Sequence, residues 1–131
     1  MMPSKDEILA RYSKKEVEAD TLGRLISVVN LKFSERLTIR RWAETDDGLA
    51  LAYMGAAAAV REIASSDGKP PVIFPFPRSF AELNSTIDIL DDEGMTAAMT
   101  ASIRLRGGDA GEEDKEAKNS QGSPASGSSP S

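Results

Sequence analysis

Asp67-Gly68-Lys69-Pro70-Pro71-Val72-Ile73-Phe74-Pro75-Phe76-Pro77 is the stretch of this sequence that decides the fold. It holds four of the seven prolines and two of the four phenylalanines in a chain of 131 residues. Proline fixes φ and moves the residue before it toward extended backbone, so a helix cannot continue through these positions. We therefore expect a stiff Pro-rich elbow (residues 67–77) between two helical regions, with Phe74 and Phe76 as its anchors.

The elbow also contains a short apolar run from Val72 to Phe74. This run is long enough for one short strand, and Asp67-Gly68 ahead of it supplies a turn. Because the neighbouring prolines cannot donate hydrogen bonds to a strand ladder, the strand is expected at the edge of a sheet or in a two-stranded piece.

The last part of the sequence, residues 107–131, contains no Leu, Ile, Val, Phe, Met, Trp or Tyr. Such a segment cannot bury enough apolar surface to offset the loss of chain entropy, so it is predicted to be a disordered tail. It carries five acidic residues and two lysines, which leaves 14 basic and 16 acidic residues in the rest of the chain. The net charge of −5 is therefore mainly a property of the tail.

The chain has no cysteine and no histidine. This composition excludes disulfides and thiolate chemistry, and it removes the commonest zinc ligands and the commonest general base. We expect a protein that is not an enzyme and that holds no metal or cofactor. The N-terminus lacks an apolar run, and the stretch from Gly48 to Val60 is much shorter than the roughly 20 residues of a membrane span, so a cytoplasmic protein is expected.

The first thirty residues predict a helix and then a hairpin. Ser4-Lys5-Asp6-Glu7 has the form of a capping box, and the helix that it opens is expected to end near Lys15. We expect this N-terminal helical segment, residues 1–15, to dock loosely on the rest of the protein. The β-branched residues that follow predict strands at Glu16–Ala19 and Arg24–Val29. The turn between them, Asp20–Gly23, places Gly23 at a position of positive φ.

Helical periodicity in the rest of the chain completes the predicted fold. The first two expected helices are residues 34–44, with Phe33 as staple and Ser34 as N-cap, and residues 48–64. A second capping box opens the next helix, residues 79–90. Residues 91–94 then interrupt the helical pattern, with Gly94 as the C′ residue, before a last helix at residues 95–105. The prediction is a mainly α protein with a small β-hairpin (α+β), whose single domain spans residues 16–106 and holds three to four helices.

The helix predicted for residues 48–64 is rich in Ala and Gly. Small side chains let another helix backbone approach closely. Within one domain this favours tight helix packing, and between two chains it would make a flat interface; the first reading is the commoner one for such a helix.

Two charged clusters raise alternatives. Arg36, Arg40 and Arg41 form one basic face, which suggests nucleic-acid binding, but the near balance of charge outside the tail favours a solvated helix face instead. Asp91, Asp92 and Glu93 suggest a metal site or an acid/base pair. Their spacing does not match an EF-hand loop, and consecutive residues in a turn point away from each other, so a solvated acidic turn is favoured.

Three patterns, taken in order, resemble a known family. They are Asp20-x-x-Gly23-Arg24-x-Ile26-x-Val28-x-x-Leu31, then Ala58-x-Val60-x-x-Ile63 leading to Asp67-Gly68-x-Pro70 and Phe76-Pro77, then Glu82-Leu83 leading to Leu90-Asp91-Asp92-Glu93-Gly94. This order is similar to that of the small tail assembly chaperones encoded by long-tailed bacteriophages and prophages. The resemblance covers about residues 17–105.

The resemblance implies a function in virion assembly without chemistry. Family members bind the long helical tape measure protein, keep it soluble in the bacterial host cytoplasm until the tail tube forms, and are absent from the mature virion. Many also occur as a longer, frameshifted form whose extra segment recruits tail tube protein, and the predicted tail would suit such a linker.

A chaperone for a helical client needs an apolar groove, and the sequence offers five candidates for its lining. They are Ile73, Phe74, Phe76, Met95 and Met99, and methionine in particular adapts to varied client surfaces. All five are also compatible with an ordinary core, and this is the favoured reading for Phe74 and Met99. The alternative function is a small regulatory or nucleic-acid-binding helical domain that uses Arg36, Arg40 and Arg41.

Overall fold

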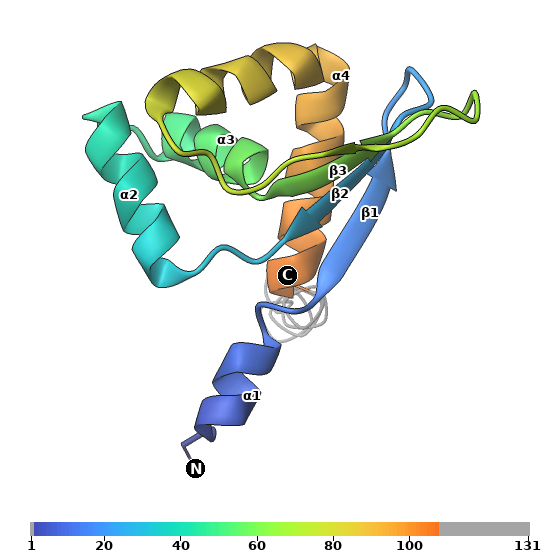
Figure 1. The fold of residues 1–131 in the computed structure, drawn as a ribbon. Coiled ribbons are helices and arrows are strands. Elements are labelled where there is room, and N and C mark those ends of the chain that lie inside the picture. Colours follow the sequence, from blue (N-terminus) through green and yellow to red (C-terminus); the bar gives the residue numbers. More distant parts are fainter. Residues whose placement is uncertain (1, 108–131) are drawn as a thin grey trace, which may run out of the picture.

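The computed structural model describes residues 2–107 and has an α+β fold (Figure 1). Its elements are α1 (Lys5–Ala10), β1 (Lys15–Ala19), β2 (Leu25–Val29), α2 (Phe33–Ala43), α3 (Gly48–Ala58), β3 (Val60–Ala64), β4 (Val72–Ile73) and α4 (Phe80–Gly107). The predicted disordered tail lies outside the described residues, apart from Gly107.

The four strands form one antiparallel sheet in the order β1-β2-β3-β4. The predicted hairpin is confirmed: Val17 pairs with Ser27, and Gly23 adopts a φ of 85° in the turn. The strand predicted in the elbow is confirmed as β4, which pairs only with β3 and so lies at the edge. One half of α4 runs along the sheet, against β1 and β2 (Figure 1).

The prediction of one helix over residues 48–64 is wrong. The helix ends at Ala58, and the chain continues as β3, in which Val60 and Ile63 are buried. Ile63 pairs with Ile26, and Val60 pairs with Val28 beyond an irregularity in the register. The apolar side chains that fit a helical period are also β-branched, and pairing with β2 decides in favour of the strand.

The predicted interruption of the helix at residues 91–94 is confirmed, but Gly94 is not a C′ residue. The non-helical residue within α4 is Asp91, with φ 57° and ψ −166°, whereas Gly94 is buried within helical backbone. Figure 1 shows the resulting bend, after which α4 turns to run down along the sheet. The second half then buries Met95, Ala98 and Ala101 in the core.

Arg24, the residue after the hairpin turn, holds this bend. It donates hydrogen bonds to the carbonyls of Ile89 at 2.8 Å and Leu90 at 2.7 Å, and its Nε lies 2.6 Å from Asp20 Oδ2. Carbonyls at the end of a helical segment lack intrahelical partners, and the guanidinium supplies them. A Cβ on Gly94 would lie 3.0 Å from Arg24 Nη2, so the glycine leaves room for this guanidinium.

The observed helix ends agree with some of the predicted ends and differ from others. The capping box between Ser4 and Glu7 is confirmed, but α1 is shorter than predicted, ends at Ala10 and buries no residue. Ser34 is not the N-cap of α2: the helix begins at Phe33 after Lys32, whose backbone N–H donates to Glu35 at 2.8 Å.

Both predicted anchors of the elbow pack against the core. Phe74 and Phe76 are half-buried, and the Phe76 ring stacks on Trp42 of α2 with centroids 6.1 Å apart. The Phe74 N–H donates to the Arg61 carbonyl at 2.8 Å, which continues the pairing of β4 with β3. The elbow therefore ties the sheet edge to α2.

Candidate functional site

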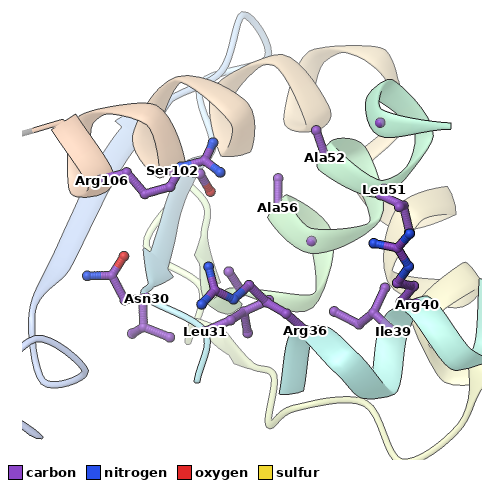
Figure 2. A pocket seen from close by; sticks show the side chains of 14 residues that line it. Asn30, Leu31, Arg36, Ile39, Arg40, Leu51, Ala52, Ala56, Ser102 and Arg106 are labelled. Carbon is purple, nitrogen blue, oxygen red and sulfur yellow. The ribbon is translucent and has the colours of Figure 1, made fainter. Parts of the chain in front are cut away.

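A groove of about 350 Å³ runs along one side of α3 (Figure 2). Its other walls come from α2, the end of α4 and the link between β2 and α2. The part contributed by α3 is a face of small residues, which we call the small-residue face: Gly48, Ala52, Gly55, Ala56 and Ala59. Their spacing of three and four residues places them on one side of the helix.

The space above the first part of the small-residue face, at Gly48, Ala52 and Gly55, is open, whereas Ala56 and Ala59 are buried. A Cβ built on Gly48 or Gly55 would meet no atom within 4 Å. Neither glycine is therefore required by packing inside the domain. Elsewhere α3 packs closely against α4, and both helices bury alanines there, including Ala57 and Ala98. The Ala-rich helix thus combines tight internal packing with a partly uncovered face.

Three basic side chains line the groove. Arg36 and Arg40 come from α2 and Arg106 from α4 (Figure 2). Arg40 is paired with Asp46 at 2.7 Å. Within residues 2–107, Arg36 and Arg106 have no ion-pair partner, although the Arg36 guanidinium lies 5.4 Å from the centre of the Phe33 ring.

The groove opens into a second hollow of about 600 Å³ beside the N-terminal segment. Four residues line both spaces and form what we call the groove junction: Asn30, Leu31, Arg36 and Arg106. Arg11 and Lys14 line the second hollow as well. Asn30 donates from Nδ2 to the Arg11 carbonyl at 2.9 Å, which holds the N-terminal segment at this place.

Ser102 lines the groove one helical turn before Arg106. Its Oγ is buried and has no hydrogen-bond partner among the described residues. Other hydroxyls of α4 are satisfied within the helix, since Thr96 donates to the Asp92 carbonyl and Thr100 to the Thr96 carbonyl, both at 2.9 Å. A buried hydroxyl without a partner is uncommon and is available to a bound group.

The five predicted client-binding residues do not share one exposed surface. Met95 is buried in the core, and Phe74, Phe76 and Met99 are half-buried against it. Ile73 is 65% exposed, and its pairing with Glu62 places it on the sheet edge. None of the five lines the groove. Their role in binding stays a prediction.

The groove contains residues that sequence reasoning did not single out, chiefly Asn30, Ser102 and Arg106. The i, i+4 spacing of Ser102 and Arg106 was the available signal, but it acquires meaning only when α4 is placed beside α2 and α3. The arginine trio is divided: Arg36 and Arg40 line the groove, whereas Arg41 does not.

The described part of the chain has no group of three or more acidic residues placed to hold a metal ion. Asp91 and Asp92 are exposed at the bend of α4. Over residues 2–107, no helix combines the length and the apolar character that crossing a membrane requires.

Comparison with known proteins gives no match. No protein-family model fits the sequence, and neither a curated protein nor a solved structure is significantly similar to it. The function proposed below therefore rests on the groove and on the sequence patterns.

Proposed function

We propose that this protein is a non-enzymatic phage tail assembly chaperone that holds one helix of the tape measure protein in the groove beside α3. The observation that carries this proposal is the open part of the small-residue face, at Gly48, Ala52 and Gly55, where a Cβ on either glycine would meet no atom within 4 Å. In this proposal the main contact surface is the small-residue face, and not the five residues that the sequence suggested.

The length of α3 suits a helical partner. The eleven residues of α3 span about 16 Å, which corresponds to about three turns of a partner helix lying alongside. Small side chains on one helix let the backbone of another approach closely, and the apolar side chains of the partner then fill the space between them. Leu31, Ile39 and Leu51 provide apolar contacts along the walls.

The family resemblance supplies the identity of the partner. Tape measure proteins are long and largely helical, and a chaperone of this kind acts by covering apolar helix faces in the host cytoplasm before the tail tube forms. A frameshifted longer form that recruits tail tube protein belongs to the same proposal. No chemical step is required of any side chain.

Co-expression with the long helical protein encoded just downstream tests the proposal. The wild-type chain should keep that protein soluble and copurify with it. Gly55→Leu should abolish both effects, because its Cβ would meet no atom within 4 Å and the rest of the new side chain would occupy the groove. Ala81→Leu, on an exposed position of α4 outside the groove, is the matched control and should behave as wild type. A client that is equally insoluble with and without this chain would contradict the proposal.

The alternative, a nucleic-acid-binding domain, has less support. Arg41 lies outside the groove, and Arg40 is already paired with Asp46. A binder of this type should be retained on DNA or RNA, should lose affinity steeply with added salt, and should lose it entirely when Arg36, Arg40 and Arg41 become alanine.

A further inference from the structure

The groove junction gives the groove a charge preference in addition to its shape. Arg36 and Arg106 approach it from different helices, and neither has an acidic partner within residues 2–107. Arg40, nearer the beginning of α3, is neutralised by Asp46. Unpaired positive charge is therefore concentrated at one end of the groove, while the other end is lined by small and apolar residues.

We propose that the groove recognises an acidic amphipathic helix, with a Glu or Asp carboxylate of the partner bound between Arg36 and Arg106. This inference rests on the proposed function and specifies the chemistry of the client segment. The apolar face of that helix lies on the small-residue face of α3. Its carboxylate lies at the groove junction.

The donors at the junction fit a carboxylate. Each guanidinium presents a planar fork of N–H donors that matches the two oxygens of a carboxylate. The Ser102 hydroxyl, which is buried and has no partner among the described residues, lies on the same side of α4 as Arg106 and can donate a further hydrogen bond. In Figure 2, Ser102 and Arg106 lie together on α4, with Arg36 reaching toward the groove from α2.

A helix is a better match than a nucleic acid at this place. A phosphate backbone requires an extended basic surface, because each contact neutralises one charge along the strand. The groove instead offers two unpaired arginines next to an apolar floor of Gly and Ala. A helix with one carboxylate beside its apolar face matches both the arginines and the apolar floor.

Binding of synthetic helical peptides to the full-length protein tests the inference. The first peptide has about 18 residues, with Leu and Ala on one face and Glu at the border of that face. Two further peptides carry Gln or Lys in place of Glu. By fluorescence anisotropy, the Glu peptide should bind about tenfold or more tightly than the Gln peptide, and the Lys peptide should bind least.

Variants of the protein localise the effect. Arg36→Gln combined with Arg106→Gln should reduce the preference for the Glu peptide to near that of the Gln peptide. Arg41→Gln, on the same helix as Arg36 but outside the groove, is the matched control and should change nothing. Ser102→Ala should weaken binding of the Glu peptide more than that of the Gln peptide. Thermal unfolding of each variant checks that it folds.

Reversing the charge of both arginines is the most decisive test. Arg36→Glu combined with Arg106→Glu should reject the Glu peptide and accept the Lys peptide, which a general loss of folding cannot produce. Equal binding of all three peptides by the wild-type chain, with binding abolished by Gly55→Leu, would overturn the charge inference and leave the proposed function standing.

Other occupants are distinguishable outcomes. An oligonucleotide that displaces the Glu peptide and binds more tightly would overturn the inference in favour of nucleic acid. A chain with alanine at Asp109, Glu112, Glu113, Asp114 and Glu116 that binds the Glu peptide much more tightly than wild type would assign the groove to the acidic segment of the chain itself. Loss of copurification with the downstream protein, with peptide binding intact, would overturn the proposed function alone.

Discussion

Arg24 joins two parts of the chain that lie 65 residues apart, through its hydrogen bond to the Ile89 carbonyl. Asp20 orients it: one carboxylate oxygen accepts from the backbone N–H groups of Leu22 and Arg24, and the other faces Arg24 Nε. Because the Asp20 side chain is fully buried, water can replace its contacts with Arg24 only when the hairpin turn separates from α4. One side chain thus fixes both the turn and the bend.

Gly94→Ala should lower stability although alanine favours helix. The added Cβ would lie 2.9 Å from Leu90 Cδ2 and 3.0 Å from Arg24 Nη2, and Leu90 is fully buried and has little room to move. We expect a loss of about 1–3 kcal/mol, measured by urea unfolding. Gly48→Ala, where the same Cβ meets no atom, is the control and should not lose stability.

Asp20 makes stability depend on acid pH. Burial would raise the pKa of Asp20, but hydrogen bonds from the backbone and side chain of Arg24 outweigh it, and the pKa is lowered. A carboxyl whose folded pKa lies below its unfolded value of about 3.9 contributes stability above that pH, and loses it as the pH falls through the folded pKa.

Asp20→Asn should therefore lower the free energy of unfolding by about 1–3 kcal/mol at pH 7, because it removes the negative charge that accepts hydrogen bonds from Arg24. Urea unfolding across pH 2–7 measures this. The difference from wild type should shrink as the pH falls below about 4, where the unfolded chain takes up the proton first, and should be lost only as the pH falls through the lowered pKa of Asp20 in the folded state. A difference that stays constant down to pH 2 would argue against this role for the charge.

At the scale of elements, α3 illustrates how one composition serves two purposes. Its alanines pack against α4 on one side, and the first part of its small-residue face is open on another. Gly55 costs the helix about 1 kcal/mol relative to alanine, and no neighbouring atom requires it. The open groove is thus maintained at some expense in helix stability.

Gly55→Leu should stabilise the isolated protein. Leucine favours helix by most of the 1 kcal/mol that glycine forfeits, and its side chain covers apolar surface in the groove. We expect a gain of about 0.5–1.5 kcal/mol in thermal or urea unfolding, alongside the loss of client binding. A destabilised variant would mean that the groove closes over Gly55 in solution.

The elbow acts through its aromatic anchor. Phe76→Ala removes the ring that stacks on Trp42 and leaves a hole between the elbow and α2. Because Phe76 is half-buried, we expect a loss of about 2–3 kcal/mol, somewhat below that of a fully buried phenylalanine. Urea unfolding with Trp42 fluorescence reports it. A stable variant with weakened client binding would instead return Phe76 to the contact surface.

For the whole molecule, locally encoded features were predictable from sequence and those decided by distant contacts were not. Asp20 and Gly23 specify the hairpin turn within five residues, and the prolines of the elbow act on their own neighbours. The strand at Val60–Ala64 depends on pairing with β2, and the position of the bend, at Asp91, depends on Arg24. The groove forms only when α2, α3 and α4 are all in place. Of its walls, only the small residues of α3 could be recognised in the sequence.

The contacts between the hairpin and α4 have a consequence for synthesis. Arg24 bonds to residues 89 and 90, which lie 65 and 66 residues further along the chain, and Arg104 pairs with Glu16 and Glu18 of β1, which lie 88 and 86 residues away. During translation, the hairpin must therefore wait until nearly the whole of α4 has left the ribosome before it gains these partners. The groove beside α3 comes into being at the same moment, because Ser102 and Arg106 are among the last described residues to emerge.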